Sequence, residues 1–396
     1  MVSIFKQISA ITSMNVRTIP QRGWMSIASI VAVALTITVL LFFLSLSAGL
    51  NKTVQGSGAD NVAIALRTGS NAELNSVVSR DQLTILASGP GVVHRGQSAV
   101  VSGELLVIVD GVKRAGTTKS NVSLRGIGPE GFAVRHGVRI AQGRMFRAGT
   151  NEMIVGAGVV REFKGFDLGH TVRLRGTNWQ IVGVFEAPGT LFESELWGDI
   201  AVTQSLFNRP NTFQTMRIQL TSPAAVKSFV DWSKHDARLD GLEIMSERAY
   251  YARQAQQSTG LFIAVAFALG FFMAIGALAG ALNTMYSSVA SRAAEIATLR
   301  IIGFSGYAAF FGTMAEAIML SALGGALGIL ISFVAFNGQS ASTLGAGFSQ
   351  TVFRLELSPG TIIAAVFVAM FIGLFGGLLP GIRAARVRPQ LELAAQ

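Results

Sequence analysis

Charged side chains are scarce in the apolar half of the chain, and three of them lie close together in one polar stretch, residues 282–306. Arg292, Glu295 and Arg300 lie in this stretch, between two long apolar runs. Guanidinium and carboxylate groups form strong charge-assisted hydrogen bonds. The stretch therefore predicts a contact site outside the membrane rather than a site of bond-breaking chemistry.

Glu316 is the second chemically notable residue, because it lies about two turns into an apolar run. A carboxyl group is costly in hydrocarbon, so we expect it to face protein or the headgroup layer, protonated or paired. A proton relay is one interpretation. A structural hydrogen bond near the cytoplasmic side is favoured, because the sequence suggests no second buried ionisable residue to continue a relay.

Catalytic and metal-binding patterns are weak. A match to G-x-G-x-x-G at residues 126–131 contains Pro129 and is not followed by a helical pattern, and residues 111–117 lack the lysine of a phosphate loop. No cysteine is present, which excludes thiolate sites and disulfides. We therefore expect no catalytic residue, no bound cofactor and no metal. The four histidines stand alone, without the spacing of metal ligands: His94, His136, His170 and His235.

Composition is that of a membrane protein. Of 396 residues, 50% are hydrophobic, 14% are charged and 44 are glycine, and the mean hydropathy is positive. Long apolar runs agree with this balance. The net charge of +10 does not indicate nucleic-acid binding, because the basic residues are scattered and form no patch among aromatic residues.

Four segments reach the length of about 20 apolar residues needed to cross a membrane. The first follows Arg17 and Arg22, as the core of a signal peptide would, but its apolar run is too long for one, so we expect it to be retained. The four predicted spans are residues 24–50, 261–286, 308–336 and 361–381.

Orientation follows from the basic residues of the short flanks. Residues 1–23, 287–307 and 382–396 each carry two or more Lys or Arg, whereas residues 337–360 carry only Arg354. We therefore expect both termini and residues 287–307 in the cytoplasm. Residues 51–257 and the short loop 337–360 are expected outside.

The amino-terminal segment, residues 1–23, has Ile4, Ile8 and Ile11 at helical spacing, with Lys6 between them. This pattern predicts an amphipathic helix on the inner membrane surface. A frayed tail is the alternative.

Residues 51–257 are long enough to bury a core, and their mixed patterns predict an α/β domain. Strand patterns occur at residues 62–66 and 105–109, the latter ending in a predicted hairpin turn at Asp110 and Gly111. A second hairpin is predicted to turn near Gly176, and a further strand at residues 216–220.

Two helices are expected near the end of this domain. Pro223 after Ser222 has the pattern of a capped helix start. Residues 243–257 are predicted as a polar helix that continues directly into the second span. Such a continuous helix could transmit movement between the outside domain and the membrane.

Three of the four predicted spans contain a G-x-x-x-G pair, a pattern that allows close helix approach. Glycine is also simply frequent in spans, but three occurrences favour packed helices, within or between subunits. The pairs are Gly276 with Gly280, Gly324 with Gly328, and Gly373 with Gly377.

The polar stretch itself suits a short helix from residue 291 to residue 302. Arg292 and Glu295 lie one turn apart, Ile296 and Leu299 share a face with Gly303, and Gly303 is suited to end the helix. A surface helix with charges and an apolar stripe can dock into a groove of another protein. An ordinary solvated loop is the alternative.

Three strings resemble one family, the FtsX/MacB/LolC-type permeases of ABC transporters. AAEIATLRIIGFS resembles the cytoplasmic segment in which a Glu-Ile-x-x-Leu-Arg-x-x-Gly pattern contacts the ATPase. EAIMLSALGGALGIL, from Glu316, resembles the third span, and PGIRAARVRPQLEL, from Pro380, resembles the carboxyl-terminal signature. The order of elements also agrees: one span, a large outside domain and three spans.

The resemblance implies four transmembrane α-helices with a large mixed α/β extracytoplasmic domain inserted between helices 1 and 2, in the bacterial inner membrane. It implies a permease that dimerises and binds two copies of a separate ATPase, which uses ATP and magnesium. Movements of the coupling helix would pass to the outside domain. By position, the ATPase-coupling residues would be Glu295, Ile296, Leu299, Arg300 and Gly303, with Ser291 and Arg292 beside them.

Three functions fit this family. Efflux with a periplasmic adaptor and an outer-membrane channel is favoured. Lipoprotein release is an alternative, and the size of the outside domain is compatible with both. A signalling permease that regulates cell-wall hydrolases or senses peptides usually has a smaller domain. A membrane enzyme is disfavoured, because no catalytic constellation is present.

Overall fold

The computed structural model describes residues 4–18, 23–117, 119–344 and 350–387. The chain divides into two compact units. We call Gly49–Gly260 with Ser340–Arg354 the inserted domain, and Met1–Ala48, Leu261–Gln339 and Leu355–Gln396 the helical unit. Parts of the predicted segments 1–23 and 382–396 lie outside the described residues.

Four helices in the described part of the chain are long and apolar enough to cross a membrane. Each contains one of the predicted spans, and the first, second and fourth extend beyond it at both ends. The order of one span, a large mixed domain and three spans is confirmed. The helices are α2 (Gly23–Gly56), α7 (Glu247–Ser291), α9 (Gly306–Phe336) and α10 (Pro359–Ala385).

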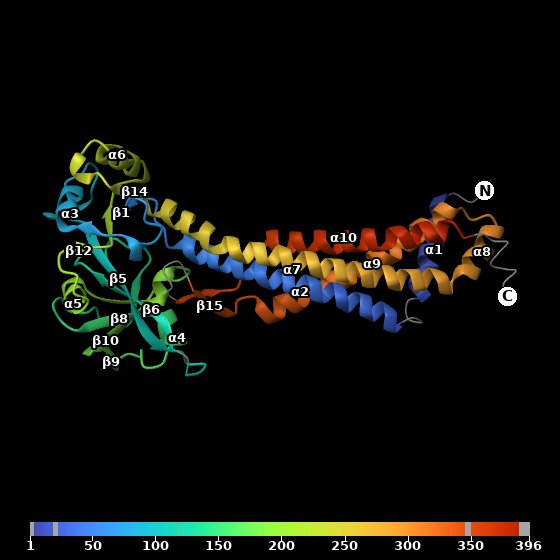
Figure 1. Ribbon diagram of the computed structural model, residues 1–396, viewed down its shortest axis with the longest axis horizontal. Coiled ribbons are helices and arrows are strands. Elements are labelled where there is room, and N and C mark those ends of the chain that lie inside the picture. The colour runs from blue at the N-terminus through green and yellow to red at the C-terminus, as the bar shows by residue number, and fades with distance from the viewer. Residues whose placement is uncertain (1–3, 19–22, 118, 345–349, 388–396) are drawn as a thin grey trace. The chain divides into compact units, whose positions relative to one another are not determined.

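Close helix contacts hold the helical unit together. Figure 1 shows α2, α7, α9 and α10 running alongside one another, with α8 (Ala293–Ile301) and α1 (Ile4–Thr18) together at one end of them. Between α2, α7 and α10, an apolar cluster includes Val33, Ala277 and Ile372. The amino-terminal segment is thus a helix over its described residues, and it packs against α9.

The inserted domain is built on one ten-stranded sheet, in the order β14-β1-β13-β5-β6-β11-β8-β10-β7, with β9 paired to β10. The β6–β11 and β8–β10 pairs are parallel and the other pairs antiparallel. The strands are β1 (Val62–Arg67), β5 (Val101–Val112), β6 (Lys119–Ile127), β7 (Arg139–Gly143), β8 (Glu152–Gly156), β9 (Thr171–Leu174), β10 (Thr177–Glu186), β11 (Glu195–Asp199), β13 (Thr215–Gln219) and β14 (Leu242–Ser246).

Short strand pairs and helices complete the inserted domain. The pairs are β2 (Val78–Ser79) with β12 (Thr212–Phe213), β3 (His94–Arg95) with β4 (Ser98–Ala99), and β15 (Ser340–Leu344) with β16 (Gln350–Arg354). The helices are α3 (Arg80–Ala87), α4 (Ala157–Glu162), α5 (Ile200–Leu206) and α6 (Pro223–Ser233), with 3-10 turns η2 (Glu73–Asn75), η3 (Leu191–Ser194) and η4 (Ala237–Leu239).

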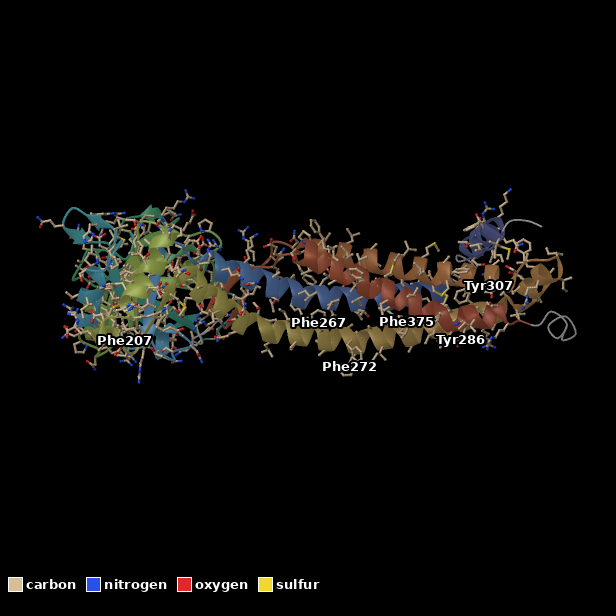
Figure 2. The ribbon with its side chains drawn as sticks, turned by 90° about the horizontal axis from the view of Figure 1, so that it is seen from above. Phe207, Phe267, Phe272, Tyr286, Tyr307 and Phe375 are labelled. Atoms are coloured by element: carbon tan, nitrogen blue, oxygen red, sulfur yellow. The ribbon has the colours of Figure 1, made fainter. Side chains whose placement is uncertain are left out.

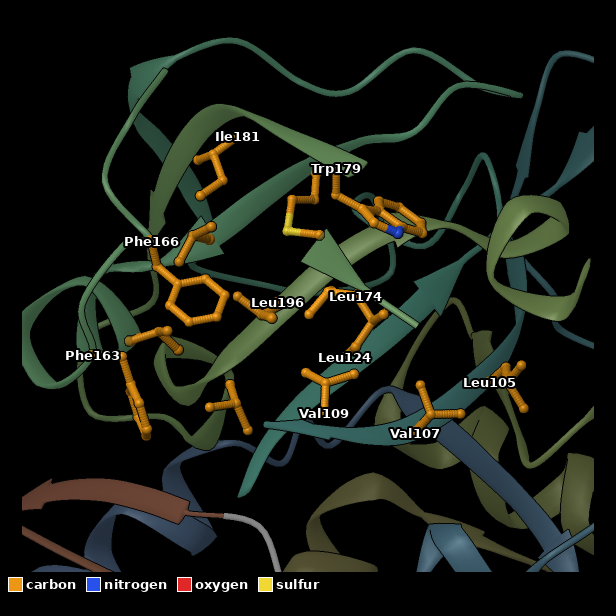
Figure 3. Close-up of a cluster of buried hydrophobic side chains, with 14 residues drawn as sticks. Leu105, Val107, Val109, Leu124, Phe163, Phe166, Leu174, Trp179, Ile181 and Leu196 are labelled. Atoms are coloured by element: carbon orange, nitrogen blue, oxygen red, sulfur yellow. The ribbon is translucent and has the colours of Figure 1, made fainter. Parts of the chain in front are cut away.

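Apolar side chains on one face of the central strands form the main core of the inserted domain. Side chains of β5, β6, β8, β10 and β11 pack on one face of the sheet against Phe163 and Phe166 (Figure 3). Trp179 and Leu196 are fully buried there. A second cluster forms where β1 and β13 meet α3 and α6, around Phe229 and Met216. The predicted mixed α/β domain is therefore confirmed.

Several local predictions are confirmed. The predicted strands at residues 62–66 and 216–220 correspond to β1 and β13. The β9–β10 hairpin turns at Arg175 and Gly176, both with positive φ. Helix α6 begins at Pro223, and the Ser222 hydroxyl accepts a hydrogen bond from the Ala225 amide at 3.2 Å.

Three local predictions are wrong. Asp110 and Gly111 do not turn: they lie within β5, where a side chain on Gly111 would clash with Phe163. Residues 243–246 belong to β14, because Leu242 and Ile244 pack into the second core, so the helix begins at Glu247. The expected short loop 337–360 contains β15 and β16.

Candidate functional site

The polar stretch forms a distinct helix. α8 runs from Ala293 to Ile301, so the predicted helix over residues 291–302 is confirmed with slightly narrower bounds. Gly303 has a φ of +101°, a conformation that favours glycine and ends the helix. Glu295 in the first turn and Arg300 in the last turn both complement the helix dipole. The alternative of a solvated loop is therefore excluded.

Arg292 precedes α8 and is buried, with 4% of its surface exposed. Its Nη2 donates to Asn15 Oδ1 on α1, and its Nε donates to Glu295 Oε2 at 3.2 Å. Its Nη1 lies 3.6 Å from Glu316 Oε2 on α9. A side chain held in this way is placed to orient α8 rather than to contact another protein.

Glu316 is also buried, and the Ser288 hydroxyl donates to its Oε1 at 3.2 Å. A structural hydrogen bond at this carboxyl group was the favoured expectation. The accompanying expectation that no second ionisable residue is buried nearby is wrong, since Arg292 is its ion-pair partner. The chain turns back between α7 and α9, and this turn brings Glu316 next to Arg292. The spacing of the two residues in the sequence does not show this contact.

The carboxyl end of α8 is tied to the end of α10. Arg300 Nη1 donates to the carbonyl oxygens of Ala385 at 2.9 Å and Val387 at 2.6 Å. A cation at the carboxyl end of a helix neutralises its exposed carbonyl groups. Ile296 is buried in an apolar cluster of the helical unit, which also contains Val289 and Ala309.

The outer face of α8 and the turn after it carry the accessible groups. The Glu295 side chain is 54% exposed, and Ile301, Ile302 and Tyr307 are 58%, 67% and 70% exposed. Figure 2 shows Tyr307 at the same end of the helical unit as Tyr286. Of the other predicted coupling residues, Ser291 and Gly303 are exposed and Leu299 is half-buried. Ile301, the last residue of α8, and Ile302, which follows it, were not singled out from sequence.

The glycine pairs differ in what they touch. A methyl group on Gly324 or Gly328 would lie 2.7 Å from a carbonyl oxygen of α2, so these two glycines allow α2 and α9 to approach closely. Gly373 and Gly377 do the same between α10 and α9. Gly276 and Gly280 of α7 face open space.

A second polar cluster, which sequence analysis missed, lies in the inserted domain. We call it the charge ladder: Arg217, Glu104, Arg125 and Glu195 stand on four adjacent strands, β13, β5, β6 and β11. Arg125 binds Glu195 through two hydrogen bonds, at 2.8 and 2.6 Å, and its Nη1 lies 2.9 Å from Glu104. Arg217 also pairs with Glu104.

Three further charged groups close the ladder from above the sheet. Glu73 of η2 accepts from Arg125 and Arg217 at 2.5 and 3.0 Å. Arg135 binds Glu104, and its guanidinium lies 4.8 Å from the Trp197 ring centroid. Glu247 of α7 accepts from Arg217 Nε at 2.8 Å. The first turns of α7 are thereby fixed to the sheet of the inserted domain.

The guanidinium groups of the charge ladder favour the ionised forms of Glu73 and Glu104. Burial alone would raise the pKa of Glu73, but Arg125 and Arg217 outweigh it and lower the pKa to about 2. The pKa of Glu104 is lowered in the same way, with Arg135 the largest of its favourable partners. Tyr251, whose hydroxyl contacts Arg217 at 3.0 Å, has its pKa raised by burial.

One sequence signal could have found the ladder. Glu104 and Arg125 each stand in a run that otherwise alternates toward an apolar core. A buried charge is costly unless it is paired, so lone charges within apolar strands indicate partners on neighbouring strands. Among the described residues, no group of three or more His, Cys, Asp or Glu could hold a metal ion.

Comparisons with known proteins match both parts of the chain. Residues 26–233 match the model of the MacB-like periplasmic core domain, and residues 267–389 match that of the FtsX-like permease C-terminal domain. No curated protein matches the chain.

Two crystal structures are similar to part of the chain. The extracellular domain of the transporter YknZ from Gram-positive bacteria is 16% identical over 47% of this chain and 100% of its own, with a TM-score of 0.36. The periplasmic region of MacB from Actinobacillus actinomycetemcomitans is 16% identical over 50% of this chain and 94% of its own, with a TM-score of 0.37.

The first family match alone spans just over half of the chain, and the second covers most of the three following helices. The order of the two matches agrees with the inserted domain and the α7–α10 segment of the structure. Both matched families describe parts of one kind of transmembrane subunit. The chain belongs to the FtsX/MacB-like family of ABC transporter permeases.

Proposed function

We propose that this permease couples ATP hydrolysis by a separate ATPase to movement of the inserted domain, for export with a periplasmic adaptor. The observation that carries the proposal is α7, one helix from Glu247 to Ser291 without a proline. Its first residue is bound to Arg217 of the inserted domain, and its last residue is followed at once by Arg292 and α8.

An unbroken helix supports this mechanism because its hydrogen-bonded backbone resists compression and bending better than a loop does. Nucleotide-driven movement of α8 would shift the carboxyl end of α7. The ion pair between Glu247 and Arg217 would then transmit that shift to the sheet. In this scheme the substrate need not pass between the spans, and ATP and magnesium act only in the partner ATPase.

Charge placement supports an inner-membrane protein with both termini in the cytoplasm. Arg17 precedes α2, Arg292 precedes α8, Arg300 lies in the last turn of α8, and Arg383 lies in the last turn of α10. The segment between α9 and α10 has Arg354. By the positive-inside rule, the inserted domain then lies in the periplasm.

Several partners follow from the proposal: two ATPase copies, a second permease copy, a periplasmic adaptor and an outer-membrane channel. The surface of α7 supports the second copy, as a homodimer or with a related permease. Phe272 is 69% exposed and projects away from the helical unit (Figure 2), while Gly276 and Gly280 on the same helix face open space. Exposed small residues on a span allow another helix to approach.

Charge reversal on α8 tests the ATPase contact. Glu295→Arg changes an exposed carboxylate, so we expect loss of co-purification with the ABC ATPase while membrane insertion is unchanged. Asp110→Arg, an exposed reversal in the inserted domain, is the matched control. Reversal at Arg300 is less informative, because that guanidinium holds the end of α10. Unchanged co-purification of the Glu295 variant would remove the α8 contact from the proposal.

Topology can be tested separately, because the chain has no cysteine of its own. Single cysteines at Ser291 and Asn178 replace exposed residues. In inside-out vesicles we expect an impermeant maleimide to label Ser291→Cys and not Asn178→Cys. The opposite labelling would overturn the orientation.

Efflux is distinguished from its alternatives by what binds the inserted domain. Full-length permease in nanodiscs is expected to retain a periplasmic adaptor from periplasmic extract. Retention of lipoproteins would favour lipoprotein release, and retention of a cell-wall hydrolase would favour a regulatory permease.

A further inference from the structure

α1 contacts the α8 region at two separated points. Near its carboxyl end, Asn15 accepts a hydrogen bond from the guanidinium of Arg292, directly before α8. Near its amino end, Gln7 Oε1 accepts from the amide of Ser305, directly after α8, at 3.0 Å. α1 therefore bridges the segment from one end to the other.

Apolar packing fixes α1 between these two points. Ile11 is buried, and a methyl group on Gly312 of α9 would lie 2.5 Å from its side chain. Residues of α1, α7 and α8 meet beside this contact, among them Met14, Ser288 and Leu299. Between its two hydrogen bonds, α1 therefore packs directly against α9.

Arg292 connects this packing to the direction of α8. The guanidinium group is planar and its donors have fixed angles, so a side chain held by three partners has one orientation. Those partners come from three helices: Asn15 of α1, Glu295 of α8 and Glu316 of α9. Loss of the Asn15 bond would leave a buried donor unsatisfied and release one of the three constraints.

We propose that α1 is a brace that holds α8 at a fixed angle to α9, with Asn15 and Gln7 as positioning residues. This proposal rests on the proposed function, because α8 needs an orientation only if it transmits movement. The expectation that α1 also lies on the membrane surface stays a prediction. Ile4 and Phe5, at 45% and 79% exposure, remain available for that contact at the free end of the brace.

Crosslinking tests the brace without the ATPase. Gln7→Cys with Ser305→Cys should form a crosslink in membranes with a short bis-maleimide. Ser13→Cys with Ser305→Cys is the control, since Ser13 is exposed and makes neither contact. Equal crosslinking of both pairs would show that α1 is not held against α8, and the brace would be excluded whatever the ATPase does.

ATPase assays with the permease in nanodiscs test the consequence. Asn15→Ala should lower the maximal stimulated rate about tenfold, the scale of one lost hydrogen bond to a charged group. The ATPase concentration giving half-maximal stimulation should stay within twofold, since the outer face of α8 is unchanged. Asn15→Asp keeps the acceptor and should restore the rate, and Ser13→Ala should leave it unchanged.

The outcomes separate the two proposals. If Asn15→Ala matches Ser13→Ala, or if it weakens binding and not the maximal rate, the brace is wrong while the ATPase contact stands. If the unaltered permease neither binds nor stimulates the ATPase, the proposed function fails. The crosslinked Gln7→Cys and Ser305→Cys protein should keep full stimulation, and loss of stimulation would mean that α1 must leave α8 during the cycle.

Discussion

The two buried ionic clusters of this permease differ in redundancy. In the charge ladder of the inserted domain, Arg125 and Arg217 each contact three carboxylates. In the helical unit, Arg292 contacts Glu316 at 3.6 Å and the half-exposed Glu295 at 3.2 Å. The charge ladder therefore contains more ion pairs, and shorter ones, than the Arg292 cluster does.

Helix α7 contributes residues to both clusters. Its first turns supply Glu247 and Tyr251 to the charge ladder. Its last turns supply Ser288 to Glu316. The helix is therefore held by an ion pair and a hydrogen bond within the inserted domain, and by a hydrogen bond within the helical unit.

The largest effect is expected from Arg217→Met. Removal of this guanidinium leaves Glu73, Glu104 and Glu247 with fewer partners, and breaking a buried ion pair costs about 3–5 kcal/mol. Urea unfolding of the purified protein in detergent, followed by tryptophan fluorescence, measures this loss. Arg139→Met is the control, because that side chain is 73% exposed in its ion pair with Glu186, and such pairs contribute about 0–1 kcal/mol. Similar losses for both variants would contradict the ladder's role.

A pH dependence should arise mainly from the charge ladder. The pKa of Glu73 in the folded protein is about 2, below its ordinary 4.5, so the folded state binds this proton less readily than the unfolded state. The resulting stabilisation, up to about 3 kcal/mol, is complete above pH 4.5 and is lost as the pH falls toward 2. Glu73→Gln should flatten the decline in stability measured between pH 5 and pH 3. An unchanged slope would show that other carboxylates dominate.

The sequence predicted those elements that local residue patterns determine. The spans, α8, α6 and several strands of the inserted domain follow from local patterns such as the apolar runs, Gly303 and the capped start at Ser222. Local patterns gave wrong predictions where contact with a residue distant in sequence determines the secondary structure. Gly111 is in a strand because Phe163 packs on it, and residues 243–246 are a strand because β1 pairs with them.

The sequence predicted the position of the candidate site, but only some of the contacts that its residues make. The α8 segment was located correctly, but which of its faces points outward depends on α1, α9 and α10. Arg292 and Ile296 turn inward because Glu316 and an apolar cluster lie there, contacts separated along the chain by more than one helix. The charge ladder needed the strand order, which alternation within single strands does not contain.

A double-mutant cycle sharpens the comparison at the second cluster. Arg292→Met and Glu316→Gln each remove one partner, and each should destabilise the helical unit. Because the two groups are in contact, their combined effect should be smaller than the sum by about 1–3 kcal/mol. Thermal unfolding in detergent measures the four stabilities. Additive losses would mean that the 3.6 Å contact contributes nothing, and Arg292 would then act through Asn15 and Glu295.

The smallest effects on stability are expected from removing one hydroxyl group in each cluster. Thr215 donates to Glu73 at 3.3 Å, where two guanidinium groups also bind the carboxylate, so Thr215→Val should cost well under about 1 kcal/mol. Ser288 donates to Glu316 at 3.2 Å, where the ion pair is longer, so Ser288→Ala should cost about 1 kcal/mol. Thermal unfolding of the two variants gives the order. A larger loss of stability for Thr215→Val than for Ser288→Ala would contradict the inferred redundancy of the charge ladder. It would show that the ladder depends on a single weak hydrogen bond and that the Arg292 cluster does not.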